Sequence, residues 1–321
     1  MADPEPPLVS CVVIFLNEER YLAEAIESVI AQSWGNWELL LVDDGSSDAS
    51  TEIATRYARR SEGKIRYLTH PGGENRGMSA SRNLGIAEAK GDLIAFLDGD
   101  DTWLAEKLQR QIALFAEHPE ALMVCGATLY WHQWQGGQGA DRLVRTGEIL
   151  RGADAGVGLV EQDRLYHPPE LMTLLYPLGR GVTPSMSGII VRRSLFDIAG
   201  GFEEEFRGLF EDQVFRAKAY LAGPIYVAGE CFDRYRQHEA SCWQTTRSTP
   251  AAQQARRRYL AWLTTYLDDV QCRDLRIRGQ LRRLRWRDRY PQLYRGLWRL
   301  RSAASDRFNR TAVGRTSSWR R

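Results

Sequence analysis

The sequence has few cysteines, no long apolar run and no lysine in its last seventy residues. Its five cysteines lack the spacing of a metal finger or a redox pair, so we expect reduced thiols. The longest early apolar run, LVSCVVIFL, is far too short to span a bilayer. The residues before it, MADPEPP, carry acid where a signal peptide carries base. Together these absences lead us to expect a cytoplasmic protein without disulfides or a spanning helix.

The charges are divided unevenly along the chain. From residue 251 onward there are 19 Arg, no Lys and five Asp, a net charge of +14. The first 250 residues hold the other 24 basic and 36 acidic side chains, a net charge of −12. We therefore predict two domains with different roles: residues 1–250, and a basic helical extension at residues 251–321.

The first half of the chain alternates buried strands with amphipathic helices. Apolar runs with little alternation predict strands, each buried on both faces of a sheet, at residues 8–15, 37–44, 64–70 and 92–101. Helical periodicity predicts helices after them, at residues 17–33, 45–60, 78–91 and 106–118. This order is typical of an α/β fold in which a mostly parallel sheet is covered on both faces.

The pattern weakens from about residue 128. Residues 130–147 are rich in aromatic residues and glycine, which favours an irregular segment that faces a substrate. Order returns with a strand and short helix at 187–202, a helix at 211–223 and a late strand at 224–238.

Carboxylates gather where two of the predicted strands end. Asp43 and Asp44 end one strand, and Asp98, Asp100 and Asp101 end another. Ligands of parallel sheets bind beyond the carboxyl ends of the strands. One aspartate would suffice to cap the helix that follows, and three add repulsion. The last three residues therefore predict a site for Mg²⁺ or Mn²⁺, and the cation would draw in a diphosphate.

Four motifs occur together in one order along the chain. They are the segment from VSCVVIFLNEER to VDDGSSDAS, the segment from NRGMSASRN to FLDGDD, GGF, and FEDQVF. In this order they resemble the family 2 glycosyltransferases over roughly Val9 to His238. The resemblance implies a GT-A (Rossmann-like) fold, with a nucleotide-binding half at 8–127 and an acceptor-side half at 128–250. It also implies a metal-dependent, inverting transfer of one sugar from a UDP- or dTDP-linked donor. The acceptor would be a hydroxyl of a glycan or lipid-linked molecule in bacterial surface polysaccharide or glycoconjugate synthesis.

The resemblance also implies the metal ligands. Asp98 and Asp100 match the family's Asp-x-Asp, with Asp100 as the favoured direct ligand, and Asp101 could share that role.

The resemblance also implies roles for residues near the donor. Asp44, with Asp43 beside it, would read the nucleotide base, because a carboxylate accepts from an imide N–H. The alternative is an Asx-turn into the next helix, which Asp48 or Ser46 could make. Arg82 resembles the family's basic residue near the donor, and the alternative is a solvated helix arginine. Asn17, after the first strand, is a further nucleotide-sugar contact, although IFLN departs from the family's usual residues there.

The second acidic motif would supply the catalytic base. The match to the family's Glu-Asp pair makes Asp212 the expected base, with Glu211 orienting the acceptor. The alternative is that both only complement the dipole of the helix that they begin. His238, near Arg236 in YRQH, resembles the family's ending and is expected to contact the diphosphate or a sugar hydroxyl, whereas a lone histidine is more often structural.

The basic extension has its own periodicity. Ile277, Leu281 and Leu284 fall at helical spacing, and the same spacing recurs at Leu293, Leu297 and Leu300. Arginines fill the other faces, with Trp286 and Trp298 among them. Such helices suit an anionic membrane surface, which would place the enzyme at the inner face of the membrane. Alternatively, the helices pack on the acidic domain. Nucleic acid ranks third because no reading motif is present, and residues 311–321 are expected to be disordered.

Two other functions remain open at the level of sequence. A nucleotidyltransferase also joins such a sheet to acidic metal ligands, but it usually carries a glycine- and basic-rich loop where this chain has FLNEER. A catalytically silent relative would bind sugar nucleotides or recruit partners to membranes. The chain lacks the Gln-x-x-Arg-Trp motif of processive synthases, which favours transfer of one sugar at a time.

Overall fold

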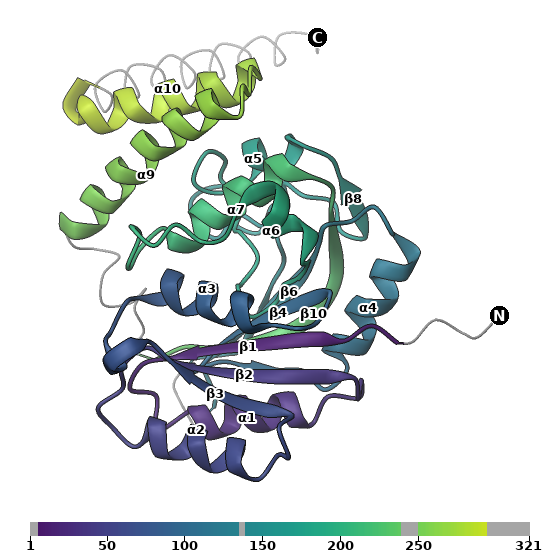
Figure 1. Ribbon diagram of the computed structural model, residues 1–321. Coiled ribbons are helices and arrows are strands. Elements are labelled where there is room, and N and C mark those ends of the chain that lie inside the picture. Colours follow the sequence, from purple (N-terminus) through teal and green to yellow (C-terminus); the bar gives the residue numbers. More distant parts are fainter. Residues whose placement is uncertain (1–5, 135–138, 239–249, 294–321) are drawn as a thin grey trace, which may run out of the picture. The chain divides into compact units, whose positions relative to one another are not determined.

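The computed structural model describes residues 6–134, 139–238 and 250–293 (Figure 1). The chain divides into two compact units, Met1–Tyr259 and Leu260–Arg321. Within the described residues, no helix combines the length and the apolar character needed to cross a bilayer. Leu297, Trp298, Leu300 and the end expected to be disordered, residues 311–321, lie outside the described residues.

The first half of the larger unit is a parallel sheet with helical connections. Its strands are β1 (Val9–Phe15), β2 (Trp37–Asp43), β3 (Ile65–Thr69) and β4 (Leu93–Asp98). They are joined by α1 (Leu22–Ile30), α2 (Ser50–Arg59), the short 3₁₀ helix η1 (Pro71–Gly73) and α3 (Met78–Glu88). The strands lie in the order β3-β2-β1-β4, and all three pairings are parallel. This half matches the predicted alternation of strands and helices.

The second half extends the same sheet with mixed pairings. Its longer elements are α4 (Lys107–Glu117), β6 (Met123–Trp131), α6 (Ser194–Ala199), α7 (Glu211–Ala222) and β10 (Ile225–Arg236). Its shorter ones are β5 (Thr102–Trp103), β7 (Arg142–Val144), β8 (Arg164–Tyr166), α5 (Glu170–Leu174) and β9 (Ile190–Arg192). β9 lies antiparallel between β4 and β6, and β10 is parallel to β6. The predicted α/β class with a mostly parallel sheet is confirmed, but the sequence pattern did not predict β6.

Both faces of β1, β2 and β4 are buried, which explains why their sequences do not alternate, whereas the edge strand β3 is only partly buried. Cys11 and Val13 of β1 belong to the same core as Leu22 and Ile26 of α1. On the other face, Phe96 of β4 contacts aromatic rings from the α6–α7 region. Figure 1 shows α1 and α2 on one side of β1–β3 and α3 on the other. Helices on both sides leave no solvated face, so successive residues of each strand are apolar.

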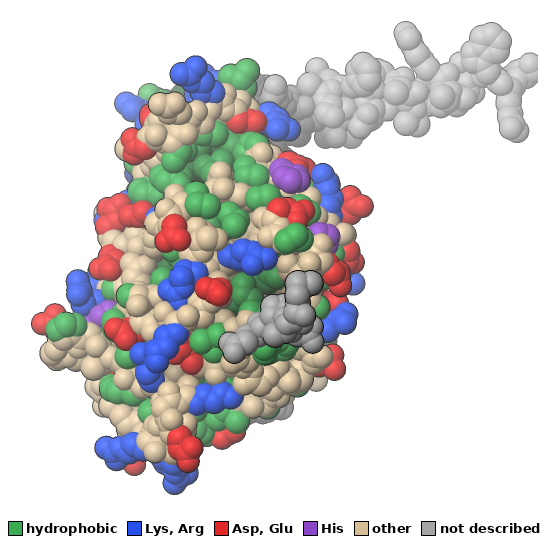
Figure 2. Space-filling view, turned by 45° about the vertical axis from the view of Figure 1, so that its right-hand side comes forward, with side chains coloured by type: hydrophobic (Ala, Val, Ile, Leu, Met, Phe, Trp, Pro, Cys, Tyr) green, Lys and Arg blue, Asp and Glu red, His purple; other side chains and the backbone are tan. Residues whose placement is uncertain are grey.

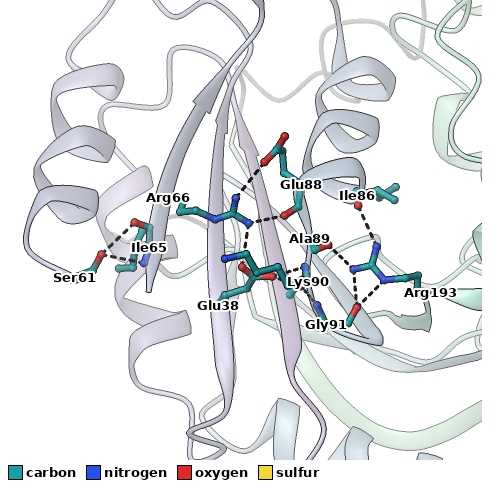
Figure 3. Close-up of polar contacts among 11 residues, drawn as sticks. Glu38, Ser61, Ile65, Arg66, Ile86, Glu88, Ala89, Lys90, Gly91 and Arg193 are labelled. Atoms are coloured by element: carbon teal, nitrogen blue, oxygen red, sulfur yellow. Dashed lines mark hydrogen bonds and ion pairs between the residues drawn. The ribbon is translucent and has the colours of Figure 1, made fainter. Parts of the chain in front are cut away.

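A polar network joins the amino ends of the strands (Figure 3). Glu38 of β2 accepts hydrogen bonds from Ser10 Oγ at 2.7 Å and from the Lys90 backbone N–H at 2.6 Å, and it pairs with Arg66 at 3.0 Å. Arg193 donates to carbonyl oxygens beyond the end of α3, at Ala89 (2.6 Å) and Gly91 (2.7 and 2.9 Å). These bonds fix the end of α3 beside the start of β4, so the opposite ends of both elements are also positioned.

The smaller unit contains the end of α9 (Pro250–Asp269) and all of α10 (Leu275–Arg289). Asp274 caps α10 by accepting hydrogen bonds from the N–H groups of Arg276 and Ile277. The two helices are joined by hydrogen bonds, one of them from Arg285 to the Thr264 hydroxyl at 2.9 Å. The predicted apolar spacing of α10 is confirmed, because Ile277, Leu281 and Leu284 are buried.

Candidate active site

The two acidic strand ends lie on the same edge of the sheet. In the register of the sheet, Ile14 of β1 pairs with Asp98 of β4, and the next residue, Phe15, pairs with Asp43 of β2. Because β1 separates β2 from β4, these carboxylates are two strand spacings apart, about 10 Å. The sequence-predicted residues Asp43 and Asp98 are therefore at one edge, as ligands of a parallel sheet require.

Arg82 of α3 ties the end of β4 to the start of α7. One guanidinium nitrogen donates to Asp98 Oδ1 at 2.7 Å, and another lies 3.0 Å from Glu211 Oε1. The Arg82 side chain is 1% exposed and lies over the Phe202 ring. This buried arginine between two carboxylates joins α3, β4 and α7, although α3 and α7 are more than 100 residues apart in the sequence. Its predicted contact with the donor stays a prediction, because the described contacts are all to protein groups.

The two acids at the start of α7 differ in exposure. Glu211 is buried, and this burial raises the pKa of its carboxyl to about 7; Arg82 acts against the shift and Asp212 adds to it. Asp212 keeps 31% of its side chain exposed, and its Oδ2 accepts a hydrogen bond of 2.5 Å from Arg216. Asp212 is therefore the acid of this pair that can meet an acceptor hydroxyl.

A left-handed residue sets where α7 begins. Phe210 has φ 75°, which is unusual for a bulky side chain, and the helix starts at the next residue. Its ring packs against Tyr259 at 5.3 Å and Tyr176 at 6.0 Å between centroids. Such packing holds the unfavourable backbone in place and fixes both acids in the first turn.

The loop after β4 is held close to β1. A Cβ atom at Gly99 would lie 2.8 Å from Phe15 Cβ, so this position needs glycine. Asp100, with 17% of its side chain exposed, lies 3.0 Å from His238 Nε2. Both oxygens of buried Asp101 accept hydrogen bonds, from Ser187 Oγ at 2.7 Å and the Arg236 N–H at 3.0 Å. Asp100 thus lies at the surface of the site, whereas Asp101 joins the loop to β10.

Several carboxylates at this edge raise one another's pKa values despite the arginines beside them. Removal from water raises the pKa of Asp98, opposed by Arg82 and reinforced by Asp100. Burial, Asp100 and Asp98 likewise raise the pKa of Asp101. The pKa of Glu18, which follows β1, is raised to about 8 by burial and then by Asp100, Asp98 and Asp48. Carboxylates that hinder one another's ionisation favour a bound cation.

The acids at the end of β2 are bound by groups of the protein itself. Asp43 Oδ2 accepts hydrogen bonds from the hydroxyls of Thr51 at 2.5 Å and Tyr67 at 3.1 Å. Asp43 Oδ1 accepts from the N–H groups of Gly45 (3.1 Å) and Ser46 (2.8 Å), so Asp43 itself makes the Asx-turn. Asp44 accepts from the N–H groups of Arg76 at 2.7 Å and Gly77 at 2.9 Å, and it is 5% exposed. Asp44 therefore holds the loop before α3, and a nucleotide base could meet only a small part of its carboxylate.

Asn17 and Asp48 connect the loop after β1 to the loop after β2. Asn17 Oδ1 accepts from the Ser47 N–H at 2.7 Å, and the Asn17 N–H donates to Ser46 Oγ at 3.0 Å. Asp48 accepts from the N–H groups of Ser50 and Glu19. The predicted nucleotide contact Asn17 is thus on the same edge of the sheet, and Asp48 serves the start of α2.

The donor set fits a hard divalent cation at part of the predicted metal site. Asp98 and Asp100 offer carboxylate oxygens and are partly exposed, and the surrounding carboxylates have raised pKa values. Asp101 would have to give up two internal hydrogen bonds to bind a metal. Within the described residues, no three His, Cys, Asp or Glu side chains are grouped to hold an ion. A substrate diphosphate would have to complete the coordination, as is common for Mg²⁺ sites.

Sequence reasoning missed two residues of this site. Glu18 was not singled out, and no local pattern marks it as a fourth acid beside the loop after β4. Arg216 follows Asp212 by four residues on a helix, a spacing that places oppositely charged side chains side by side. That spacing could have predicted the Arg216–Asp212 pair.

Comparison with known proteins finds a family model that matches part of the chain. Residues 10–150 match the model of glycosyl transferase family 2. The match over these residues is in keeping with the resemblance to the family 2 glycosyltransferases that the motifs predicted.

Two curated relatives match less than half of the chain. EpsE of Bacillus subtilis, provisionally named a glycosyltransferase, is 40% identical over 112 residues, which are 35% of this chain and 40% of EpsE. TuaG of the same species, provisionally named a teichuronic acid biosynthesis glycosyltransferase, is 33% identical over 150 residues, which are 46% of this chain and 57% of TuaG. The chain thus spans about half the length of these relatives.

Solved structures show the same fold over a longer range. TarS 1–349 of S. aureus, in complex with UDP-GlcNAc, has a TM-score of 0.58 at 21% identity, covering 88% of this chain and 73% of that one. The mannosyltransferase PcManGT of Pyrobaculum calidifontis, in complex with GDP-Man and Mn²⁺, has a TM-score of 0.53 at 14% identity, covering 87% and 69%. At these identities the likeness establishes the fold alone.

Proposed function

We propose that the chain is a metal-dependent, inverting glycosyltransferase that transfers one sugar from a UDP- or dTDP-linked donor to an acceptor hydroxyl. The observation that carries the proposal is the Arg82 bridge, which joins Asp98, at the end of β4, to Glu211 beside the exposed Asp212. A site of this kind holds donor-binding acids and a candidate base in one place. TarS was solved in complex with UDP-GlcNAc, which is in keeping with a uridine nucleotide.

The residues of the site divide the reaction between them. Asp212 would remove the proton of the acceptor hydroxyl, which becomes the nucleophile at the anomeric carbon. Arg216 donates one hydrogen bond to Asp212 Oδ2 and another to the Pro184 carbonyl at 2.7 Å, which fixes the Asp212 carboxylate. Attack from the face opposite the departing diphosphate inverts the anomeric centre without a covalent sugar intermediate.

Asp98 and Asp100 are the groups that would hold Mn²⁺ or Mg²⁺, with His238 beside Asp100. When bound, the cation would offset the charge of the leaving nucleoside diphosphate. Asp44 and Asn17 shape the loops where the base would lie. A glycan or lipid-linked acceptor of surface polysaccharide synthesis agrees with the name of TuaG. A cytoplasmic enzyme at the inner face of the membrane would meet such an acceptor.

Replacing the base tests the proposal. Asp212→Asn should lower kcat by about 10²–10⁴-fold, because general base catalysis is lost, while nucleotide binding persists. The matched control is Asp197→Asn, which changes an exposed acid in the first turn of another helix, α6, and should leave kcat unchanged. Transfer is measured as the release of nucleotide in the presence of an acceptor. Nucleotide binding is measured by calorimetry. Full activity of Asp212→Asn would refute the assigned base.

A further inference from the structure

A hydroxyl that solvent does not reach lies against the loop after β4. Over the face drawn in Figure 2, charged side chains of both signs are largely interspersed at the surface. Ser187, which precedes β9, is instead fully buried, with 0% of the residue exposed. Its hydroxyl can therefore act only through the protein groups that it contacts.

The Ser187 hydroxyl bonds to both ends of the turn that carries the candidate metal ligands. Its Oγ donates to Asp101 Oδ2 at 2.7 Å and accepts from the Asp98 backbone N–H at 3.2 Å. Residues 98–101, which we call the acidic turn, are closed by a hydrogen bond of 3.0 Å from the Asp101 N–H to the Asp98 carbonyl. One hydroxyl thus joins the first residue of the acidic turn to its last, with Asp100 between them.

Other elements hold Ser187 in place. Its carbonyl accepts from the indole N–H of Trp103 in β5 at 2.7 Å, and its own N–H donates to Ser185 Oγ at 3.0 Å. The carbonyl of the next residue, Gly188, accepts from the side-chain amide of Gln111 in α4 at 3.0 Å. These bonds fix Ser187 relative to β5 and α4, so its hydroxyl is a rigid anchor for the acidic turn.

The segment that contains Ser187 also contacts the support of the expected base. The Pro184 carbonyl accepts a hydrogen bond of 2.7 Å from Arg216, and Arg216 also donates to Asp212. Residues 184–187 therefore bond to the acidic turn through Ser187 and to the partner of Asp212 through Pro184. A donor held at the acidic turn and an acceptor held at Asp212 react only if the two sites keep a fixed separation.

We propose that Ser187 is a positioning residue whose hydroxyl holds the acidic turn in the conformation that binds the divalent cation. Metal ligands are commonly oriented by such outer partners, and loss of one typically costs about 10–100-fold in metal affinity. This inference rests on the proposed function, which supplies the cation. Buried Ser187 would act through Asp98 and Asp101 and would touch neither the cation nor the nucleotide.

Binding of Mn²⁺ to the full chain in the presence of UDP tests the role without any sugar transfer. The signal of free Mn²⁺ in electron paramagnetic resonance measures this binding. Ser187→Ala should weaken Mn²⁺ binding about tenfold or more. At saturating Mn²⁺ its kcat should return to within about threefold of the original value, because Asp212 and Arg216 are unchanged.

Ser10 provides a matched control at the amino ends of the strands. It is also 0% exposed, and its hydroxyl donates to Glu38 Oε1 at 2.7 Å and accepts from the Gly91 N–H at 2.8 Å. Figure 3 labels both of these partners. Ser10→Ala and Ser187→Ala should lower Tm by similar amounts, about 2–6 °C, because each removes a buried hydroxyl from a carboxylate. Only Ser187→Ala should weaken Mn²⁺ binding.

A second pair of variants separates the hydroxyl from packing. Ser187→Thr and Ser187→Val have nearly the same shape and differ in the hydroxyl, so any strain from the added methyl groups is shared. Ser187→Thr should bind Mn²⁺ at least about fivefold more tightly than Ser187→Val, because it keeps a group that bonds to Asp98 and Asp101.

Three results would overturn the positioning role and leave the proposed function standing. They are Mn²⁺ binding by Ser187→Ala as tight as that of the unsubstituted chain, an equal loss of Mn²⁺ binding in Ser10→Ala, and equal Mn²⁺ affinity of Ser187→Thr and Ser187→Val. A folded, unsubstituted chain that binds no Mn²⁺ with UDP would instead contradict the proposed function, and this inference would fall with it.

Discussion

The two ends of the parallel strands contain the same residue types in opposite electrostatic states. At the amino ends, burial alone would raise the pKa of Glu38, but hydrogen bonds from Ser10, the Lys90 N–H and Arg66 outweigh it and lower that pKa. At the carboxyl ends, the pKa values of Glu18, Asp98 and Asp101 are all raised. At the amino ends, an ionised acid whose charge is balanced by hydrogen bonds and an arginine contributes to stability. At the carboxyl ends, acids that repel one another lower the stability.

This difference separates structural from functional carboxylates. Acids whose hydrogen bonds are satisfied internally hold elements together, as Glu38 does for β1, β2 and β3. Acids that repel one another gain only when a ligand brings positive charge, which is a mark of binding and catalytic sites. Substitutions of matched residues at the two ends of the strands test this difference.

The largest expected effect comes from the arginine at each end. Arg82→Met removes the positive charge between Asp98 and Glu211 and leaves these carboxylates without a partner. It should lower the free energy of unfolding by about 3–5 kcal/mol. Arg66→Met removes a pair that is 25% exposed on the arginine side and should cost only about 1 kcal/mol. Urea denaturation of both variants measures the difference. Equal losses would contradict the distinction between the two ends.

A second effect, of intermediate size, concerns the expected catalytic base Asp212 and its partner Arg216. Arg216→Lys keeps the positive charge but loses the fork that reaches both Asp212 and the Pro184 carbonyl. Arg216→Lys should lower kcat about tenfold to a hundredfold. It should leave nucleotide affinity unchanged, because Arg216 contacts the catalytic base Asp212 and not the loops expected to bind the nucleotide. Steady-state transfer and calorimetry together measure this. A loss confined to nucleotide affinity would refute the role.

The smallest effects have opposite signs at the two ends. Between about pH 4.5, where Glu18 titrates in the unfolded chain, and about pH 8, where it titrates when folded, the folded state binds the extra proton. Stability therefore falls as pH rises across this window, and Glu18→Gln should raise Tm by about 2–4 °C at pH 8 and by less at pH 5.

Glu38→Gln should do the reverse. Its lowered pKa contributes stability that is present above the unfolded pKa and is lost as pH falls. The variant should lose about 1–2 kcal/mol at pH 7, and the loss should shrink toward pH 3. Thermal melts of both variants across pH measure the pair. The same sign of change for both at pH 8 would contradict the comparison.

Much of the fold followed from local pattern. The buried runs of β1 to β4 need no partner to be recognised, because strands covered on both faces are apolar throughout. β6 was missed because its last residues, Leu129 to Trp131, run into an aromatic, polar segment that lacks strand periodicity. Which acids end the strands was also readable, since position in a parallel sheet follows from element order.

The electrostatic organisation of the site was not readable in the same way. Arg82 and Glu211 are 129 residues apart, and no spacing rule brings them together. Asp44 was expected to read a base, yet its oxygens accept N–H groups from a loop more than thirty residues away. Burial of a charged group depends on every element packed around it, so such roles emerge only from the tertiary structure.

We expect the crowded acids at the carboxyl ends of the strands to bind a cation that in turn binds a diphosphate. Calorimetric titration of the chain with UDP, dTDP, GDP and CMP, each with and without Mn²⁺, tests this most directly, with Asp100→Asn as the comparison variant. We expect UDP or dTDP to bind only when Mn²⁺ is present. We expect Asp100→Asn to lose this Mn²⁺-dependent binding. Binding of none of these nucleotides by the folded protein, or equal binding without the metal, would contradict it.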